Sequence, residues 1–335
     1  MQFIEALQGK RVLFITTKNI DYIRNVQEIK MLEQEAASLT TIYSNKKKYV
    51  GRIIEIWMQM LKVKKKDFDV IFIGFAPQLV FPFYGKFADK PTVIDFFISV
   101  YDTLINDRKM FSQRSIVAKC SHLLDKYVIK RADYIITDTQ ADAAYFMKEF
   151  QGQETKFETL YLEADSSIYY KREQRKSKLL QDKYVVLYFG SILPLQGVET
   201  VLEAIAMLCS RSDIYFQIIG PIPDAYRKPM QENVEYIDWL SQEELAEYIG
   251  NADLCLAGHF SKEIDKARRT VPGKAYIYEA MGKSMVLGDN TANRELFEED
   301  DRHVFVEMGN SRVIVEAVCR GLSASFKKRD LYAAN

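Results

Sequence analysis

The sequence predicts an α/β protein made of two Rossmann-like parallel-sheet domains that face a central cleft. Three observations support this fold class. The chain has 335 residues, more than one ordinary domain. Short runs of Val, Ile and Phe alternate with segments of helical periodicity, the pattern of parallel strands covered by helices. This alternation occurs twice, and a charged segment without apolar periodicity, residues 169–183, separates the two series.

Each series supplies the strands of one domain. In the first domain, residues 1–174, strands are expected at residues 11–16, 39–43, 70–73, 92–95 and 134–137. In the second, residues 175–310, they are expected at residues 185–189, 214–219, 234–237, 254–257, 284–287 and 303–306. Residues 311–335 are expected to form a helical segment able to cross back to the first domain. Because ligands bind at the carboxyl ends of parallel strands, each domain should hold one ligand.

Composition argues against several classes of protein. Hydrophobic residues make up 48% of the chain, which is typical of a folded protein. Lys plus Arg equals Asp plus Glu at 46 each, so no global charge favours nucleic acid. The four cysteines form no C-x-x-C pair and are interpreted as reduced core residues. With no leader segment and no apolar stretch near about 18 residues, we expect a cytoplasmic protein that could associate with the cytoplasmic face of a membrane.

Two segments of the second domain suggest an anion site. Residues 188–202, YFGSILPLQGVETVL, pass from a buried strand through Gly190 and Gly197 into a helix. Glycines let the backbone approach a phosphate, and the helix start offers free N–H groups. An ordinary strand–helix turn has the same pattern, so this segment alone leaves both readings open.

The second segment, residues 268–282, is RRTVPGKAYIYEAMG. Arg268, Arg269 and Lys274 surround a Val-Pro-Gly turn that opens a helix, an arrangement suited to a diphosphate. Glu279 follows one turn deeper and could accept hydrogen bonds from ribose hydroxyls. The alternative is a solvated basic turn in which Glu279 caps the helix or pairs with Lys283.

Together with YIDWLSQEELAEYIGNADLCLAG, these segments resemble the donor-binding half of retaining glycosyltransferases of family four, which have the GT-B fold. The first half is similar to the acceptor half of one branch of that family through DVIFIGFAPQ, VIDFFISVYDTLINDR and RADYIITDTQADAAYF. The resemblance covers nearly the whole chain. It implies a nucleoside diphosphate sugar on the second domain, with Glu279 on the ribose and the base near Asp238 and Trp239. The predicted donor-binding residues are Gly190, Ser191, Gln196, Gly197, Gly220, Asp238, Trp239, Arg268, Arg269, Gly273, Lys274 and Glu279.

The chain departs from the family pattern at three positions. Ser191 and Gln196 stand where many members have an Arg and a Lys that neutralise the diphosphate, and Val271 stands where many have a second glutamate. Charge-assisted hydrogen bonds contribute roughly 1.5–3 kcal/mol each, so two lost cations need substitutes. We expect the Arg-Arg pair and Lys274 to supply them.

The predicted catalytic residues are Asp95, Lys274 and Glu279. Asp95 ends a predicted strand, and the resemblance places it near a residue that faces the transferred sugar, so it would orient or deprotonate the acceptor hydroxyl. It could instead cap the next segment. Asp102 and Asp138 are weaker candidates of the same type, and His259 could touch the donor sugar or be a solvated loop residue. The three histidines are too scattered for a zinc site, so we expect no metal and no cofactor beyond the donor.

Residues 46–66, KKKYVGRIIEIWMQMLKVKKK, combine an apolar helical stripe with lysines at both ends. This pattern indicates either peripheral contact with an anionic membrane or a helix packed on the first sheet. The resulting hypothesis is retaining transfer of a sugar to a hydroxyl of a lipid-linked glycan, as in bacterial capsule or other surface polysaccharide. The alternatives are a non-catalytic nucleotide-sugar-binding partner subunit and a sugar-nucleotide 2-epimerase.

Overall fold

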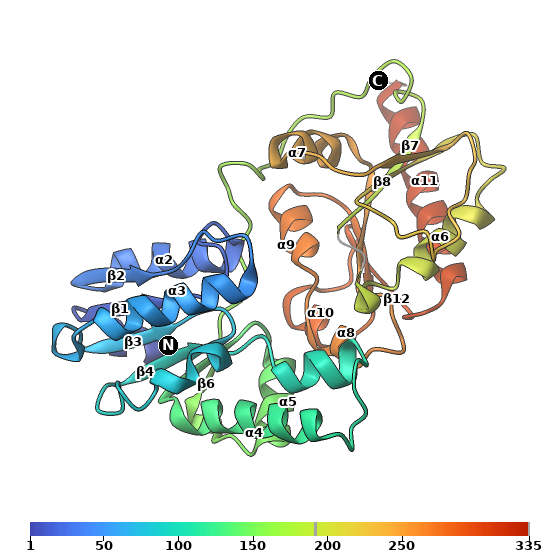
Figure 1. Cartoon of the computed structure of the whole chain (residues 1–335). Coiled ribbons are helices and arrows are strands. Elements are labelled where there is room, and N and C mark those ends of the chain that lie inside the picture. The colour runs from blue at the N-terminus through green and yellow to red at the C-terminus, as the bar shows by residue number, and fades with distance from the viewer. Residues whose placement is uncertain (191–192, 334–335) are drawn as a thin grey trace. The chain divides into compact units, whose positions relative to one another are not determined.

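The computed structural model describes residues 1–190 and 193–333, which form two α/β units (Figure 1). The first unit spans Met1–Glu163 and the second Ala164–Asn335. This division lies before residue 175, where the sequence suggested it, because the connecting segment packs on the second unit. The Gln174 amide donates to the carbonyl of Ala252 at 3.0 Å, and Lys176 pairs with Asp253.

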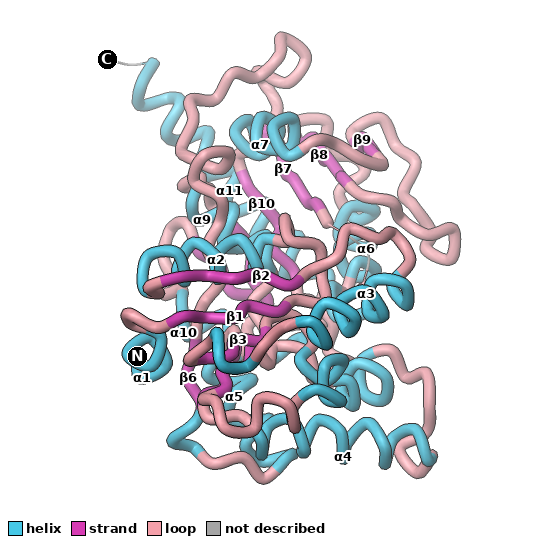
Figure 2. Tube along the Cα trace, turned by 60° about the vertical axis from the view of Figure 1, so that its left-hand side comes forward, coloured by secondary structure: helices cyan, strands magenta, loops and turns pink. Residues whose placement is uncertain are grey.

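The first unit contains a six-stranded parallel sheet of order β2-β1-β3-β4-β5-β6. Figure 2 shows β2, β1 and β3 side by side. The strands are β1 (Arg11–Ile15), β2 (Ser38–Ile42), β3 (Val70–Ile73), β4 (Thr92–Asp95), β5 (Tyr134–Thr137) and β6 (Phe157–Thr159). The five expected strands are present. The sixth, β6, was missed because its three residues are only partly buried and carry no apolar run.

Helices cover both faces of this sheet. The longer helices and the turn η2 are α1 (Gln2–Leu7), α2 (Ile23–Glu35), α3 (Tyr49–Lys62), η2 (Pro77–Phe83), α4 (Ile116–Arg131) and α5 (Gln140–Phe150). The short turns are η1 (Lys65–Asp67), η3 (Asp102–Asp107) and η4 (Glu154–Lys156). One core cluster joins α3, η2, α4 and α5 to the sheet, and a second joins α1 and α2 to its other face. This division follows from right-handed crossovers on either side of β1.

The second unit contains another six-stranded parallel sheet, of order β12-β11-β10-β7-β8-β9. Its strands are β7 (Tyr184–Phe189), β8 (Ile214–Ile219), β9 (Val234–Ile237), β10 (Leu254–Gly258), β11 (Met285–Gly288) and β12 (His303–Val306). The helical elements are η5 (Pro194–Gln196), α6 (Val198–Met207), α7 (Gln242–Asn251), α8 (Lys266–Arg269), α9 (Gly273–Ala280), α10 (Thr291–Leu296) and α11 (Ser311–Ala333). All six expected strands are present. Helix α11 packs on α6, β7 and β12 of its own unit.

Among the helices of the described residues, none combines the length and apolarity that a membrane span requires.

Candidate functional site

Two glycines bring the chain close to itself where β7 and β8 end. Gly190 donates its backbone N–H to Ile219 at 3.0 Å, and Gly220 donates to Ile237 at 2.8 Å. Both have positive φ, 141° and 127°. A Cβ on Gly220 would lie 2.3 Å from the carbonyl oxygen of Gly190, so no side chain fits there. The carboxyl edge of the sheet is therefore lined by bare backbone.

The turn η5 and Gly197 continue this edge into helix α6. Gly197 has φ 63°, and a Cβ there would lie 2.5 Å from the backbone N of Ser261. The carbonyl of Gln196 accepts a hydrogen bond from the N–H of Phe260 at 3.1 Å. Gly197 also lines a pocket of about 350 Å³, a size in the range of small-molecule sites. The glycine thus places the start of α6 beside the segment that follows β10.

Lys274 is the central side chain of this edge. Although it lies in the first turn of α9, only 5% of it is exposed. Its Nζ donates to Oε1 of Gln196 at 2.5 Å and lies 3.9 Å from the ring centroid of Tyr188, whose hydroxyl donates to the same oxygen at 3.1 Å. A Cβ on Gly190 would be 3.2 Å from this Nζ. We call Gly190, Gln196, Gly197 and Lys274 the Lys274 cluster.

The ammonium of Lys274 lacks a compensating charge. Burial lowers its pKa well below the usual value, and no carboxylate within the described part of the chain offsets that effect. A buried cation that is not neutralised by the protein is stabilised when an anion binds. The Lys274 cluster therefore has the electrostatics of an anion site. Gln196 replaces the lysine of the family pattern, and in the structure its amide oxygen holds a lysine that comes from α9 instead.

The two arginines are placed differently from Lys274. Arg269 is 8% exposed, and its Nε donates to Asp265 at 3.0 Å, one turn earlier in the chain. Arg268 is exposed. Among the described residues, Lys274 is the predicted cation that contacts Gln196 and lies beside Gly190.

His259 follows β10 directly and is buried. Its Nδ1 lies 3.0 Å from the carbonyl of Thr270, which can only accept, so Nδ1 carries the hydrogen and Nε2 is left as an acceptor. Burial lowers the pKa of His259 to about 3. The ring is therefore neutral at physiological pH. The sequence suggested a solvated loop as one reading of this residue, and its burial contradicts that reading.

Glu279, predicted to contact the ribose, lies at the other end of α9 and is paired within the protein. Its Oε1 accepts from Arg302 at 3.0 Å, and its Oε2 contacts Nε2 of His303 at 2.8 Å. His303 is the first residue of β12 and pairs with Met285, the first residue of β11. The carboxylate therefore lies at the amino edge of the sheet. Helix α9 connects the carboxyl end of β10 to the amino end of β11, so each residue carries the chain about 1.5 Å away from the Lys274 cluster.

The remaining predicted donor residues have no contacts that assign them a role. Gly273 is the first residue of α9, directly before Lys274. Asp238 and Trp239 follow β9 at the carboxyl edge, and Trp239 is 77% exposed, which leaves its ring accessible for stacking. Ser191 lies outside the described residues.

Asp95 is at the carboxyl end of β4, as expected, but its surroundings do not suit a catalytic base. Both carboxylate oxygens accept hydrogen bonds from Arg24, at 2.9 and 3.0 Å, and Asp95 has no exposed surface. Glu28 is also fully buried, and burial together with the charge of Asp95 raises its pKa well above the usual value. The pair that Asp95 forms with Arg24 therefore holds α2 on the sheet. Arg24 and Glu28 were missed, although two charges four residues apart in an otherwise amphipathic helix could have indicated a buried pair.

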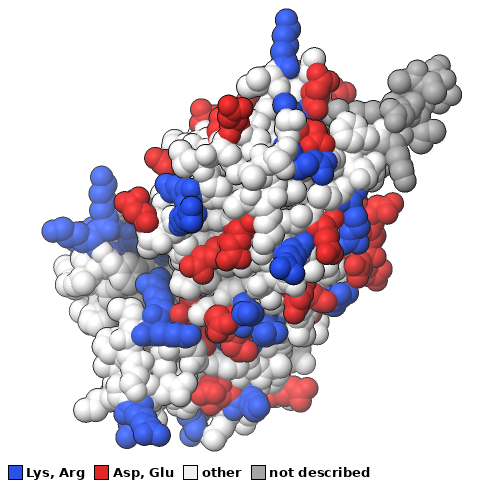
Figure 3. Space-filling view, turned by 90° about the vertical axis from the view of Figure 1, so that its right-hand side faces the viewer, with Lys and Arg blue, Asp and Glu red and all other residues white. Residues whose placement is uncertain are grey.

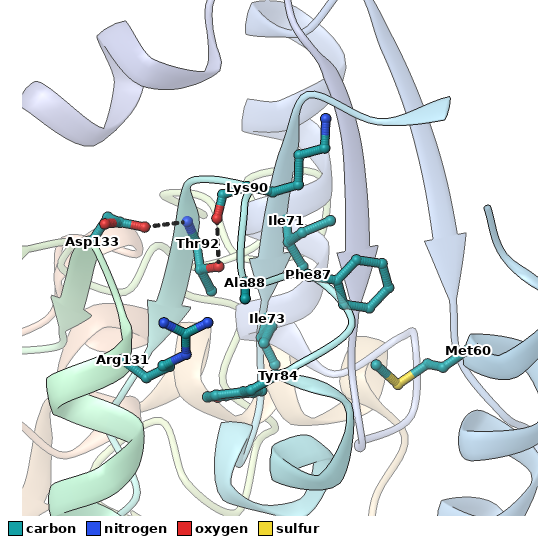
Figure 4. A pocket seen from close by; sticks show the side chains of 10 residues that line it. All are labelled: Met60, Ile71, Ile73, Tyr84, Phe87, Ala88, Lys90, Thr92, Arg131 and Asp133. Carbon is teal, nitrogen blue, oxygen red and sulfur yellow. Dashed lines mark hydrogen bonds between the residues drawn. The ribbon is translucent and has the colours of Figure 1, made fainter. Parts of the chain in front are cut away.

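Asp102, one of the weaker acid candidates, is hydrogen-bonded within the first unit, and a small pocket lies at the opposite end of β4. Asp102 accepts hydrogen bonds from Asn106 at 3.0 Å and Tyr145 at 3.3 Å. The pocket in Figure 4 measures about 60 Å³, roughly the space of two waters, and lies near the amino end of β4, where Asp133 accepts from the N–H of Thr92 at 2.8 Å. It is too small for a sugar. Within the described ranges, no group of three or more His, Cys, Asp or Glu could hold a metal ion.

Residues 183–324, which contain the whole Lys274 cluster, match the family model described as Glycosyl transferases group 1. The second half of the chain therefore belongs to the group 1 glycosyltransferases. Enzymes of this family move a sugar from a nucleotide-sugar donor with retention of anomeric configuration. No curated protein matches the chain.

Solved structures confirm the GT-B fold of this glycosyltransferase. HepE from Anabaena, solved with UDP-glucose, aligns with a TM-score of 0.64 and 14% identity over 95% of this chain and 91% of that one. Sucrose-phosphate synthase from Thermosynechococcus elongatus aligns with a TM-score of 0.66 and 10% identity over 97% and 100%. An alpha-glucosyltransferase solved with UDP and a DNA 13-mer containing an HMU base gives 0.62 and 12% over 97% and 92%. At these identities the likeness concerns the fold.

Proposed function

We propose that this glycosyltransferase binds the diphosphate of its donor at the Lys274 cluster and transfers the sugar to a hydroxyl of a lipid-linked glycan. The observation that carries the proposal is the buried amino group of Lys274, held by Gln196 beside bare glycine backbone and without a carboxylate partner among the described residues. A diphosphate would supply the negative charge that stabilises the protonated form of this amino group, and the glycines leave room for the diphosphate oxygens.

Catalysis in this proposal consists of positioning and charge stabilisation. The bond between the anomeric carbon and the diphosphate breaks, and negative charge grows on the departing oxygen. A fixed ammonium and the N–H groups at the start of α6 stabilise that charge more than they stabilise the bound donor. The neutral imidazole of His259, two residues beyond Ala257 on β10, offers an acceptor for a sugar hydroxyl.

The proposals for the nucleotide and the acceptor rest on the similar structures and on the surface of helix α3. HepE and the alpha-glucosyltransferase were each solved with UDP or UDP-glucose, so UDP is the first nucleotide to test, with Trp239 as the stacking surface for the base. Helix α3 exposes apolar side chains between lysine clusters, which supports contact with an anionic membrane and an acceptor carried by a lipid. A role in capsule or other surface polysaccharide rests on the family alone.

Two buried lysines of the second unit provide a matched test. Lys274 and Lys283 are 5% and 8% exposed, and burial lowers the pKa of both, but Lys283 donates to the carbonyl of Gly250 at 2.9 Å on the far side of α9. We expect Lys274→Met to weaken UDP binding in calorimetry and to abolish slow release of UDP from UDP-sugars. Lys283→Met should leave both unchanged. Equal affinity of the two variants for UDP would remove the basis of the proposal.

A further inference from the structure

Helix α3 exposes a continuous apolar stripe. The side chains in the stripe are Val50, 73% exposed, Ile54, 49%, Met58, 54%, and Leu61, 68%. Their spacing of four, four and three residues places them on one face of the helix. The buried residues, Arg52, Ile56 and Met60, are offset by about half a turn and face the sheet. The sequence raised a membrane contact and a core-packed helix as alternatives, and the structure shows that α3 has both faces.

Helix α4 exposes a second stripe of the same kind, which the sequence did not indicate. Its exposed residues are Ile116, 80%, Leu123, 63%, and Tyr127, 44%, with the exposed thiol of Cys120 between them. Its buried residues include Ala118, Ser121 and Asp125, on the opposite side. A monomeric protein seldom exposes two such stripes on neighbouring helices without using them.

The two stripes face the same way. Ile56 and Met60 of α3 and Val128 and Ile129 of α4 belong to one core cluster, so both helices lie on the same face of the first sheet. Both also contact η2, which exposes 44% of Phe81. Because the buried sides of both helices point to one sheet face, their exposed sides point away from it together.

The surface around the stripes is strongly basic. Residues 46–66 contain eight Lys and Arg against one Glu, and residues 108–131 contain seven against one Asp; Arg52 and Asp125 are the buried members of these sets. The chain as a whole is balanced at 46 of each sign. On the face in Figure 3, acidic and basic side chains are interspersed. The excess of positive charge around α3 and α4 is therefore local.

We propose that α3 and α4 together form a docking surface for an anionic lipid bilayer. Apolar side chains would enter the interface while lysines at the rim meet lipid phosphates. A second copy of the chain is a poorer occupant, because two such basic surfaces would repel each other. The inference rests on the proposed function only for the idea that a lipid-linked acceptor makes docking useful.

The α4 stripe can be tested with α3 left intact. We would measure flotation with vesicles of phosphatidylcholine containing about 30% phosphatidylglycerol, and with phosphatidylcholine alone. Ile116→Ser/Leu123→Ser should lower binding to the anionic vesicles at least about tenfold. The control, Met207→Ser/Met230→Ser, removes residues of the second unit that are 51% and 84% exposed and should bind normally. Normal binding by the α4 variant would overturn the inference.

Two exposed cysteines provide an independent readout. Cys120 lies on α4 and Cys209 follows α6 in the second unit. In a Cys319→Ser background, each is labelled alone with a polarity-sensitive fluorophore after the other is changed to Ser. Anionic vesicles should shift the emission to the blue at Cys120 and leave Cys209 unchanged. No shift, equal shifts, or a Cys120 shift caused by protein concentration without vesicles would contradict bilayer docking.

These experiments distinguish failure of the docking surface from failure of the proposed donor site. UDP affinity of the Ile116→Ser/Leu123→Ser variant should equal that of the unmodified protein, because neither residue belongs to the second unit. Loss of vesicle binding with normal UDP affinity supports docking through α4. Normal vesicle binding by a protein that does not bind UDP would overturn the donor site and leave the docking surface standing.

Discussion

Replacing Lys274 with Met should have opposite effects on stability and on donor binding. Burial lowers the pKa of Lys274, so the unfolded chain binds the proton more tightly than the folded one. The free protein therefore loses stability as pH falls below the ordinary lysine pKa, and each pH unit of lowering corresponds to about 1.4 kcal/mol. Met has no proton to lose, so the variant should melt at a higher temperature than the unmodified protein near pH 7.

The same change should weaken UDP binding. One charge-assisted hydrogen bond contributes about 1.5–3 kcal/mol, so its loss should raise the Kd roughly ten- to hundredfold. A bound diphosphate favours the charged ammonium and raises the pKa of Lys274, so binding to the unmodified protein should take up a proton. Affinity should then fall as pH rises from the pKa of the free protein toward that of the complex.

Calorimetry in buffers of different ionisation enthalpy measures this proton directly, and thermal melts measure the stability change. The unmodified protein with UDP at 100 times its Kd should gain about 2.7 kcal/mol. At the same UDP concentration, Lys274→Met should gain only about 0.4–1.4 kcal/mol, and Lys283→Met should show the full gain. Binding without proton uptake at a pH above the lowered pKa, together with unchanged affinity in Lys274→Met, would refute the reasoning.

Three further variants test other parts of the structure. Asp95→Asn should destabilise the first unit by about 3–5 kcal/mol in calorimetry, because it removes the charge to which Arg24 donates two hydrogen bonds, and Arg24→Met/Asp95→Leu should cost less. A stable Asp95→Asn protein without transferase activity would support a catalytic role. Gly197→Ala should lower the free energy of unfolding by at least about 1–2 kcal/mol because of the positive φ at this position, and it should also weaken UDP binding. As a control, Gly85→Ala places its methyl group in open space and should leave the melting temperature unchanged. Glu279→Gln should change the free energy of unfolding by no more than about 1 kcal/mol, since this carboxylate is 40% exposed. UDP affinity should stay within twofold by calorimetry, and a tenfold loss of affinity would support the predicted contact with the ribose.

Glu279 should make stability depend on pH in the opposite direction to Lys274. Burial raises its pKa, but hydrogen bonds from His303 and Arg302 outweigh that effect and lower it overall. Its contribution to stability is therefore present above the ordinary glutamate pKa and is lost as pH falls through the lowered value. Comparing melts of Glu279→Gln and the unmodified protein between about pH 3 and 6 should show the difference vanishing at the acid end.

Local sequence was sufficient for most of the secondary structure. Buried parallel strands are short runs of Val, Ile and Phe, and eleven of them were expected within a residue or two of their observed bounds. Strand β6 was not expected because its partial burial removes the apolar run that identifies a strand. The sequence also singled out Gly197 by its place between a loop and a helix, and the structure shows that only a bare backbone fits there.

Roles of charged residues were predicted less well, because they depend on partners far along the chain. Spacing alone could not show that Asp95 meets Arg24 across 71 residues or that Glu279 meets His303 across 24. The sequence placed Asp95 at the end of a strand and Glu279 one turn inside a helix, but it did not give the direction of either side chain. The α4 stripe was missed for a related reason: its exposed apolar residues look like core residues until the sheet shows which side of the helix is covered.

The sequence by itself determined the two parallel-sheet units, the glycine-rich edge of the second one and the presence of a cation in the first turn of α9. These features follow from local patterns of hydrophobicity and from backbone conformations that only glycine adopts freely. The tertiary structure alone decided that Lys274 is buried against Gln196 with no carboxylate beside it in the described residues, while Arg24 is buried against Asp95 and Glu28. Burial and the distance between charges set the energy of an ion, and both arise only when segments distant in sequence are packed together.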